Sequence, residues 1–189
     1  SVSAITDRDG KRSSIVAVMV DMTEHKRAEA DLLRREARSR FLAELHEQLD
    51  RVVDPDAVRA TASRALAGFL GVHAVDVIDI QQTLSTEMRS LNALGAGQLR
   101  AHLSLGQTVA VADVRVDPLT AGQARSYEER SIRSGVAAPL MREGRWVGAL
   151  MVTHDAPRRW DDDDLELIRT VTERTWLAYE NARLLRDLS

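Results

Sequence analysis

Few residues in this sequence are spaced so that they could carry out a reaction. The five histidines occur singly, and no two of them have the spacing of a helical metal-binding pair. The chain has no cysteine, so it can form no thiolate nucleophile, disulfide or thiol-linked cofactor. Its glycines make neither a phosphate-binding loop nor a nucleophile elbow. We therefore expect no catalytic residue, no metal and no cofactor in this chain.

Four consecutive aspartates occupy residues 161–164. Clustered carboxylates could suggest a divalent-cation site, but neighbouring positions on a helix point in different directions. Acidic side chains at the start of a helix instead complement its dipole. We interpret the run as the beginning of a C-terminal helix that continues to the end of the sequence.

One histidine has an acidic neighbour that could assist phosphate transfer. Residues 41–49, FLAELHEQL, resemble the box that carries the phospho-accepting histidine of sensor kinases, with His46 as acceptor and Glu47 as the adjacent acid. The match is partial, because Leu45 stands in place of the serine and the arginine and proline of that box do not follow. A phospho-accepting segment is thus an alternative to a plain linker histidine on a mixed helix face.

Any site must be positioned by residues 134–157, the most strongly patterned part of the chain. Two apolar runs, 136–141 and 146–153, are joined by Arg-Glu-Gly-Arg, whose glycine suits a hairpin turn with positive φ. Both alternating sets of the second run are apolar. One set is Val147, Ala149 and Met151, and the other is Gly148, Leu150 and Val152. The pattern predicts a central strand that is covered on both faces.

This stretch also carries a family resemblance. The sequence GVAAPL, then GRWVGALMV, then an acidic helix start resembles the end of a GAF domain, and residues 113–118 match the D-V-R-x-D-P segment of that family. The resemblance implies an α+β fold. It would have an antiparallel sheet of five or six strands, helices on one face, long N- and C-terminal helices, and a pocket over the other face.

Polar side chains that could converge on such a pocket are Asp113, Tyr127, Arg133 and His154, although each also has a surface or structural interpretation. GAF relatives that reduce methionine sulfoxide or attach bilins use cysteines, which this chain lacks. Few aromatic residues argue weakly against stacking of a large planar chromophore. The sequence therefore leaves open which small molecule, if any, is bound.

The remaining elements follow from periodicity and from turn residues. Helices are predicted at residues 57–70, 98–105 and 121–132, and further strands at 72–80, 87–94 and 108–114. Asp76 and Asp79 are unusual inside a strand and suggest an edge or an opening.

Two long helices bracket this sheet, at residues 24–53 and 161–189. The first carries apolar residues at an average spacing of about 3.67, an eleven-residue period that keeps the stripe nearly straight. It is longer than a small domain needs, so we expect part of it to pack against a second copy of the chain. The predicted homodimer residues are Leu33, Ala37, Phe41, Leu45, Ala178, Ala182 and Leu185. The alternative is that the stripe covers only its own sheet.

The N-terminus suggests an attached domain. Short β-prone runs at 2–6 and 14–20 flank a polar turn, and DMTEHKRAE at 21–29 resembles the junction that closes a PAS domain and opens its exit helix. The predicted organisation is a PAS remnant at 1–22, a linker helix at 23–53 and a GAF domain at 54–189.

The whole chain fits a signalling module better than other classes. A net charge of −3 with mixed signs offers no field for nucleic acid, and no apolar run reaches the roughly 18 to 20 residues that span a membrane. We expect a cytoplasmic, dimerising sensory module, the regulatory part of a sensor histidine kinase. The alternatives are the phospho-accepting segment at His46 and a structural dimerisation domain without a ligand.

Overall fold

The computed structural model describes residues 5–6, 12–13, 22–80 and 98–188. Contacts divide the chain into two units, Ser1–Ser39 and Arg40–Ser189, and each is described by itself. The boundary falls inside the predicted linker of residues 23–53. In the described residues, no helix is long and apolar enough to cross a membrane.

The first unit contains a short strand pair and the beginning of a helix. β1 (Ile5–Thr6) runs antiparallel to β2 (Arg12–Ser13), with Ile5 opposite Ser13. The strand predicted at 14–20 lies outside the described residues. Helix α1 (Met22–Asp50) begins near its predicted start, and its part from Arg40 onward belongs to the second unit.

The second unit is built on an antiparallel sheet with the described order β3-β6-β5-β4. Its strands are β3 (Ala74–Asp79), β4 (Val109–Val111), β5 (Ser134–Arg142) and β6 (Arg145–His154). The predicted hairpin is confirmed, and its two turn residues, Glu143 and Gly144, both have positive φ values of 49° and 74°. Such a turn matches the right-handed twist of the strands that it joins. β5 and β6 are central in the sheet, as the two-sided apolar pattern predicts.

The alternation of side chains between the two faces of the sheet is interrupted near the start of β6. Leu140 pairs with Gly148 whereas Met141 pairs with Trp146, so Val147 is an extra residue that forms a β-bulge. Val147 packs against the helix side of the sheet, and Trp146 packs against the opposite side. The prediction that Val147 shares a face with Ala149 and Met151 is therefore wrong, because the bulge shifts the alternation.

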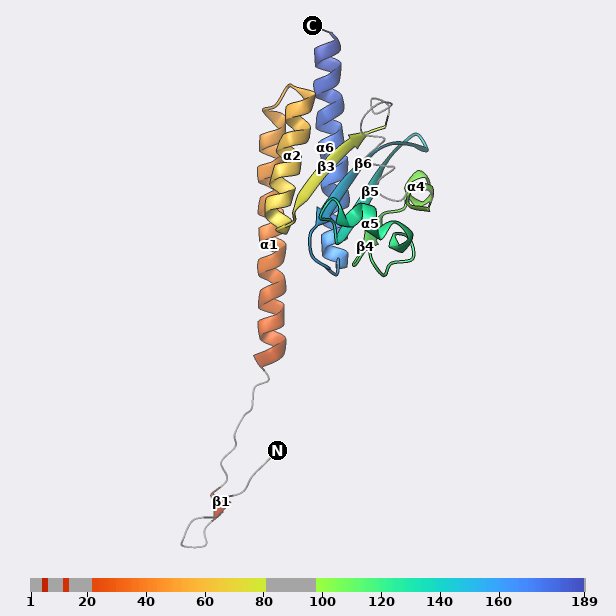
Figure 1. Ribbon diagram of the computed structural model, residues 1–189. Helices are drawn as coiled ribbons and strands as arrows, with labels where there is room; N and C mark the ends of the chain where they lie inside the picture. The colour runs from red at the N-terminus through yellow and green to blue at the C-terminus, as the bar shows by residue number, and fades with distance from the viewer. Residues whose placement is uncertain (1–4, 7–11, 14–21, 81–97, 189) are drawn as a thin grey trace. The chain divides into compact units, whose positions relative to one another are not determined.

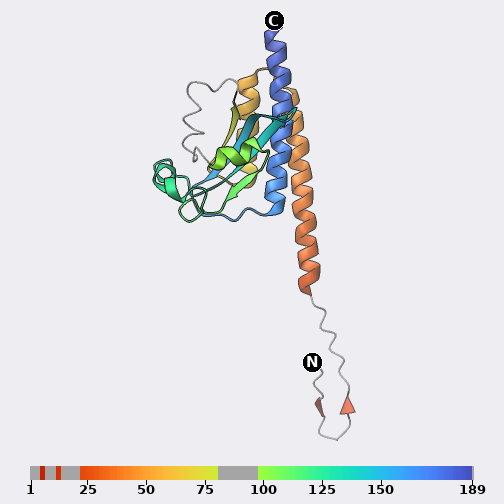
Figure 2. The same cartoon turned by 90° about the vertical axis from the view of Figure 1, so that its right-hand side faces the viewer.

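Helices α2 (Pro55–Leu70) and α6 (Asp162–Asp187) cover one face of the sheet, and the C-terminal part of α1 packs in the same core (Figures 1 and 2). The side chain of Asp54 accepts a hydrogen bond from the Ala57 N–H at 2.9 Å and so caps α2. Asp161 caps α6 in the same way through the Asp164 N–H at 2.8 Å. The predicted acidic helix start is confirmed. The core on this side is apolar and includes Leu66, Leu150, Val152, Ile168 and Val171.

Short elements cover the opposite face. They are α4 (Gln98–Ser104), the 3₁₀ turn η1 (Ala121–Gln123) and α5 (Ala124–Glu128). A smaller apolar cluster lies between them and the sheet, and it includes Leu99, Leu103, Val111, Ala137 and Met151. The second unit thus has a layer of long helices on one side of the sheet and a layer of short segments on the other.

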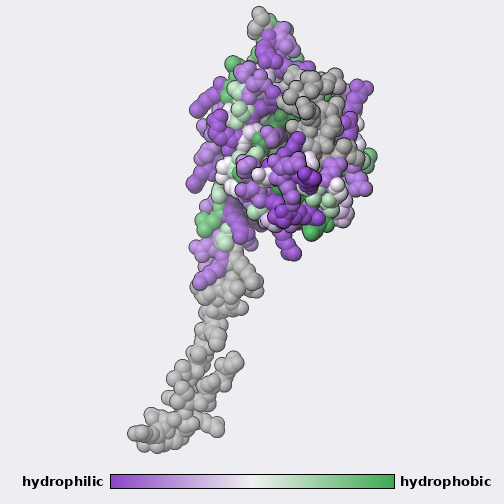
Figure 3. Space-filling model, in the orientation of Figure 1, coloured by the Kyte–Doolittle hydropathy of each residue, from purple (hydrophilic) through white to green (hydrophobic). Residues whose placement is uncertain are grey.

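The predicted α+β class and the antiparallel sheet are confirmed. The described sheet has four strands, and the further strand predicted at 87–94 lies outside the described residues. In the view of Figure 3 the described surface of the second unit is mostly hydrophilic, and apolar side chains show only in small separate groups. The apolar residues of this unit are mainly inside.

Candidate functional site

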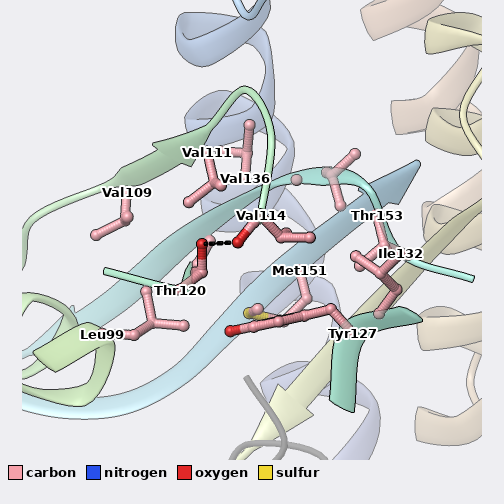
Figure 4. Close-up of a pocket in the computed structure, with 13 residues that line it drawn as sticks. Leu99, Val109, Val111, Val114, Thr120, Tyr127, Ile132, Val136, Met151 and Thr153 are labelled. Carbon is pink, nitrogen blue, oxygen red and sulfur yellow. Dashed lines mark hydrogen bonds between the residues drawn. The ribbon is translucent and has the colours of Figure 1, made fainter. Parts of the chain in front are cut away.

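The pocket of the second unit lies on the face of the sheet that the short elements cover (Figure 4). β5 and β6 form its wall through Gly135, Val136, Ala137, Met151, Val152 and Thr153. The other described lining residues come from α4, β4, α5 and the segments between them, and they are Leu99, Val109, Val111, Val114, Thr120, Tyr127 and Ile132. None of these side chains carries a charge.

The pocket is small. Its volume is about 30 Å³. A buried water needs about 10–15 Å³ by this measure, so the space holds two or three water-sized groups. Sites for drug-sized ligands are about ten times larger or more. The pocket therefore suits a very small molecule.

Three hydroxyl groups belong to the described pocket lining. The Thr120 hydroxyl donates to the carbonyl of Val114 at 2.9 Å, and the Thr153 hydroxyl donates to the carbonyl of Ala74 at 3.4 Å. The Tyr127 hydroxyl is buried without a hydrogen-bond partner among the described residues. Burial raises the pKa of Tyr127 to about 12, so its hydroxyl is protonated at neutral pH. Among the described lining side chains, Tyr127 therefore has a hydroxyl proton that is free to be donated to a ligand.

The four predicted pocket residues do not come together. Tyr127 lines the pocket, and Asp113, Arg133 and His154 do not. Arg133 binds Asp113 at 2.8 Å, and hydrogen bonds from the Arg133 side chain and the Arg115 backbone hold the pKa of Asp113 below its usual value. The carbonyl of His154 accepts a hydrogen bond from the Arg133 N–H at 2.8 Å. These three residues tie the start of β5 to neighbouring segments.

A wider surface groove of about 540 Å³ lies between α6 and the outer end of β5. Its charged residues are partly engaged, since Arg142 lies 3.7 Å from Glu180 and Arg174 donates to the Leu42 carbonyl at 3.1 Å. None of its described lining residues has a polar side-chain atom that is both buried and unpartnered. The smaller pocket is accordingly the stronger candidate for a binding site.

A buried polar cluster lies on the helix-covered side of the sheet and was not predicted from the sequence. Asp79 at the end of β3 is 1% exposed and accepts a hydrogen bond of 3.0 Å from the Tyr179 hydroxyl of α6. Arg183 of the same helix lies 3.7 Å from Asp79, and the Arg59 guanidinium of α2 lies 5.7 Å from the centre of the Tyr179 ring. An aspartate inside an apolar strand is the signal that points to this cluster. Asp79 faces the helices and joins α6 to the sheet.

The predicted homodimer residues fall into different surroundings. Phe41, Leu45 and Ala182 are buried in the core of the second unit, and Phe41 stacks on Phe69 at 4.3 Å between ring centres. These three residues pack in their own domain, so their predicted role in a homodimer stays a prediction. Three others, Leu33, Ala37 and Leu185, are exposed, while Ala178 is half-buried against the core.

The residues considered for other chemistry lie on the surface. His46 of α1 is exposed, and its Nε2 lies 3.5 Å from Asp50 on the next turn. Among the aspartates at 161–164, Asp161 caps α6 and Asp164 pairs with Arg158 at 3.0 Å. In the described residues, no group of three or more possible ligands could hold a metal ion.

Comparisons with known proteins agree on one fold. The family model described as GAF domain matches residues 39–179. No match is found among curated proteins. The structure is similar to a phycoerythrobilin-bound GAF domain from a cyanobacterial phytochrome, with a TM-score of 0.57 and 16% identity over 80% of this chain and 97% of the other.

Two further solved structures are similar to the same extent. Free methionine-R-sulfoxide reductase from Neisseria meningitidis has a TM-score of 0.57 and 17% identity over 78% of this chain and 91% of its own. A domain described as part of a two-component sensor histidine kinase protein from Sinorhizobium meliloti 1021 has a TM-score of 0.55 and 16% identity over 71% of this chain and 97% of its own. At these identities the similarity shows the fold alone.

Proposed function

Because this chain belongs to the GAF domain family, we propose that it is a dimerising sensory module that relays a signal between its N- and C-terminal helices. In this proposal residues 1–22 are the end of a PAS domain, and the chain forms the regulatory part of a sensor histidine kinase. The similarity of residues 21–29 to a PAS junction and the solved sensor-kinase domain of the same fold support this placement. The chain itself performs no catalysis.

The observation that carries the proposal is the division of α6 into two apolar faces. One face is buried in the domain core through Ile168, Val171 and Tyr179. The other exposes Leu177 and Leu184, which are 56% and 61% accessible, and it is continued by the C-cap residue Leu188, which is 84% accessible. Their spacing of seven and four residues places them along one side of the helix. An apolar stripe of this kind favours contact with the same stripe of a second copy.

The N-terminal helix supplies a second apolar surface. Within the first unit, Leu32 and Leu33 of α1 are 58% and 60% exposed. These leucines lie among charged residues and offer exposed apolar surface to a partner helix. In the proposed dimer, α1 and α6 each pack beside their counterparts.

The sheet offers a physical route from the pocket to α6. Ala137 and Met151 face the pocket, whereas Ala138 and Leu150, their neighbours in sequence, pack in the core beneath α6. A ligand that spreads β5 and β6 would therefore disturb the packing of α6. Helix shifts of about 1–2 Å are the usual scale of such switches.

The chemistry of two similar proteins does not suit this chain. A bilin is far larger than a pocket of about 30 Å³. The resemblance to sulfoxide-reducing GAF relatives implies catalytic cysteines, and this chain has none. A sensory role without catalysis is consequently the better reading of the same fold.

The proposal is tested by charged substitutions in the two exposed stripes. Leu33→Asp and Leu184→Asp should each shift the chain from dimer towards monomer in multi-angle light scattering, because a carboxylate is costly inside an apolar interface. Ala60→Asp is the control, since it adds the same charge at an exposed position of α2. Circular dichroism should show all three variants folded. A parent chain that remains monomeric at high concentration would refute the proposal.

A further inference from the structure

Tyr127 belongs to α5 and is only 2% exposed, yet its hydroxyl has no hydrogen-bond partner among the described residues. Figure 4 shows the ring lying along the pocket with its hydroxyl directed towards the side where Leu99 lies. Burying a hydroxyl without a partner costs free energy, so native proteins rarely leave one unpaired. A partner that occupies the pocket would remove this cost.

The other polar groups of the described lining are already donating. Figure 4 shows the hydrogen bond from Thr120 to the Val114 carbonyl, which holds the Thr120 hydroxyl at the pocket wall. Thr153 donates to the carbonyl of Ala74 outside the pocket. The remaining described side chains of the lining are hydrocarbon, apart from the thioether of Met151. Among the described lining side chains, Tyr127 therefore carries the hydroxyl that is left to donate a hydrogen bond to a ligand.

The surroundings of the pocket disfavour a charged ligand. No described lining residue is ionised at neutral pH, and the Asp113–Arg133 ion pair nearby is satisfied internally and is not part of the lining. A charged molecule would lose its hydration here without gaining a counter-charge. The protonated Tyr127 hydroxyl can donate a hydrogen bond to a neutral acceptor.

We propose that the pocket binds an uncharged molecule of about two or three non-hydrogen atoms that presents one hydrogen-bond acceptor, an ether or carbonyl oxygen, to the hydroxyl of Tyr127. The ligand would fill the space of about 30 Å³ between α5 and the central strands. This inference rests on the proposed sensory function and gives the chemical class of the ligand.

The experiment compares two gases of similar size, one of which has an oxygen atom where the other has a methylene group. Dimethyl ether and propane each have three non-hydrogen atoms, but only the ether has an acceptor oxygen. The full chain, labelled with ¹³C at the methionine and valine methyl groups, would be titrated with each gas by nuclear magnetic resonance. Saturable shifts at the Met151 and Val111 methyl groups report occupation of the pocket.

Dimethyl ether should bind more tightly than propane to the parent chain. Tyr127→Phe should weaken ether binding about tenfold, which corresponds to one hydrogen bond, and should leave propane binding unchanged. Retained propane binding also shows that the variant pocket is folded. The matched control is Tyr179→Phe, which removes the hydroxyl of a buried tyrosine on the opposite face and should alter neither affinity.

Three results would overturn the proposal. The first is equal binding of the two gases to the parent chain, and the second is unchanged ether binding by Tyr127→Phe. The third is the absence of any shift at the pocket methyl groups with either gas. The last result would mean that the pocket holds an ordered water only. None of these results depends on the number of subunits. Each would therefore reject the ligand class, and the light-scattering experiment would still decide separately whether the chain is a dimer.

Discussion

The two faces of the sheet differ in how completely they are packed. On the helix side, Leu150 of β6 is fully buried beneath long helices, and Asp79 and Tyr179 join α6 to the sheet by a hydrogen bond. On the opposite side, Met151 of the same strand lies beside a cavity, and Tyr127 keeps an unpartnered hydroxyl. The comparison indicates that the first face maintains the fold and the second face has space for a ligand. Four predictions test this difference.

Neighbouring residues on β6 give the largest expected contrast. Leu150→Ala should lower the free energy of unfolding by about 2–5 kcal/mol, because it leaves a cavity between the sheet and the long helices. The long helices cannot easily move to fill this cavity. Met151→Ala should cost less, since it enlarges a space that short segments border. Urea denaturation of both variants measures the difference. An equal or larger cost for Met151→Ala would contradict the comparison.

The close approach of α6 to the sheet gives the second contrast. A Cβ atom at Gly148 would lie 2.7 Å from the Ile78 carbonyl oxygen and 2.7 Å from Cζ3 of Trp176. Gly148→Ala should therefore lower the free energy of unfolding by about 1–3 kcal/mol through overpacking. Gly122→Ala is the control, because a Cβ there meets nothing within 4 Å. If thermal denaturation shows the two variants equally stable, the helix side is not packed as described.

The buried tyrosines of the two faces give a smaller contrast. Tyr179→Phe should cost about 1 kcal/mol, because it removes the hydrogen bond to the buried carboxylate of Asp79. Tyr127→Phe should change the free energy of unfolding by less than about 0.5 kcal/mol or increase it, since its hydroxyl has no protein partner to lose. Equal losses in urea denaturation would show that both hydroxyls are paired.

The smallest expected effect is the loss of folding stability at alkaline pH. Burial is the first cause that raises the pKa of Tyr127 and of Tyr179 to about 12. A raised pKa in the folded state means that the extra stability is present below pH 10 and is lost as the pH rises towards 12. By pH 10.5 each tyrosine should have lost about 0.8 kcal/mol relative to pH 8. Unfolding of Tyr127→Phe across this range should show a smaller loss than the parent. An unchanged slope would contradict the burial of the phenol.

The elements that depend on local pattern could be predicted from the sequence. The hairpin of residues 134–157 follows from two apolar runs around Glu143 and Gly144, and the starts of α2 and α6 follow from capping aspartates. The bulge at Val147 could not be predicted, because alternation does not show which residue of a strand is extra. An apolar stripe on a helix does not show which surface it packs against. The sequence pattern of Phe41 and Leu45 is therefore as consistent with a dimer interface as with the core of their own domain.

The site was less predictable than the fold, because it joins residues that are distant in the sequence. Tyr127 reaches the pocket through α5, whereas Asp113 and Arg133 bind each other, and no local pattern distinguishes these outcomes. Asp79 is recognisable in the sequence as an acidic residue inside an apolar strand. Its partner Tyr179 lies one hundred residues later, so only the folded chain shows that Asp79 faces the helices.

Native mass spectrometry of the purified chain would report both the number of subunits and any retained ligand in one spectrum. We predict a mass of two chains, with at most a few non-hydrogen atoms of added mass for each chain. A single chain at every concentration would contradict the dimeric relay. A retained molecule as large as a bilin would contradict the small pocket.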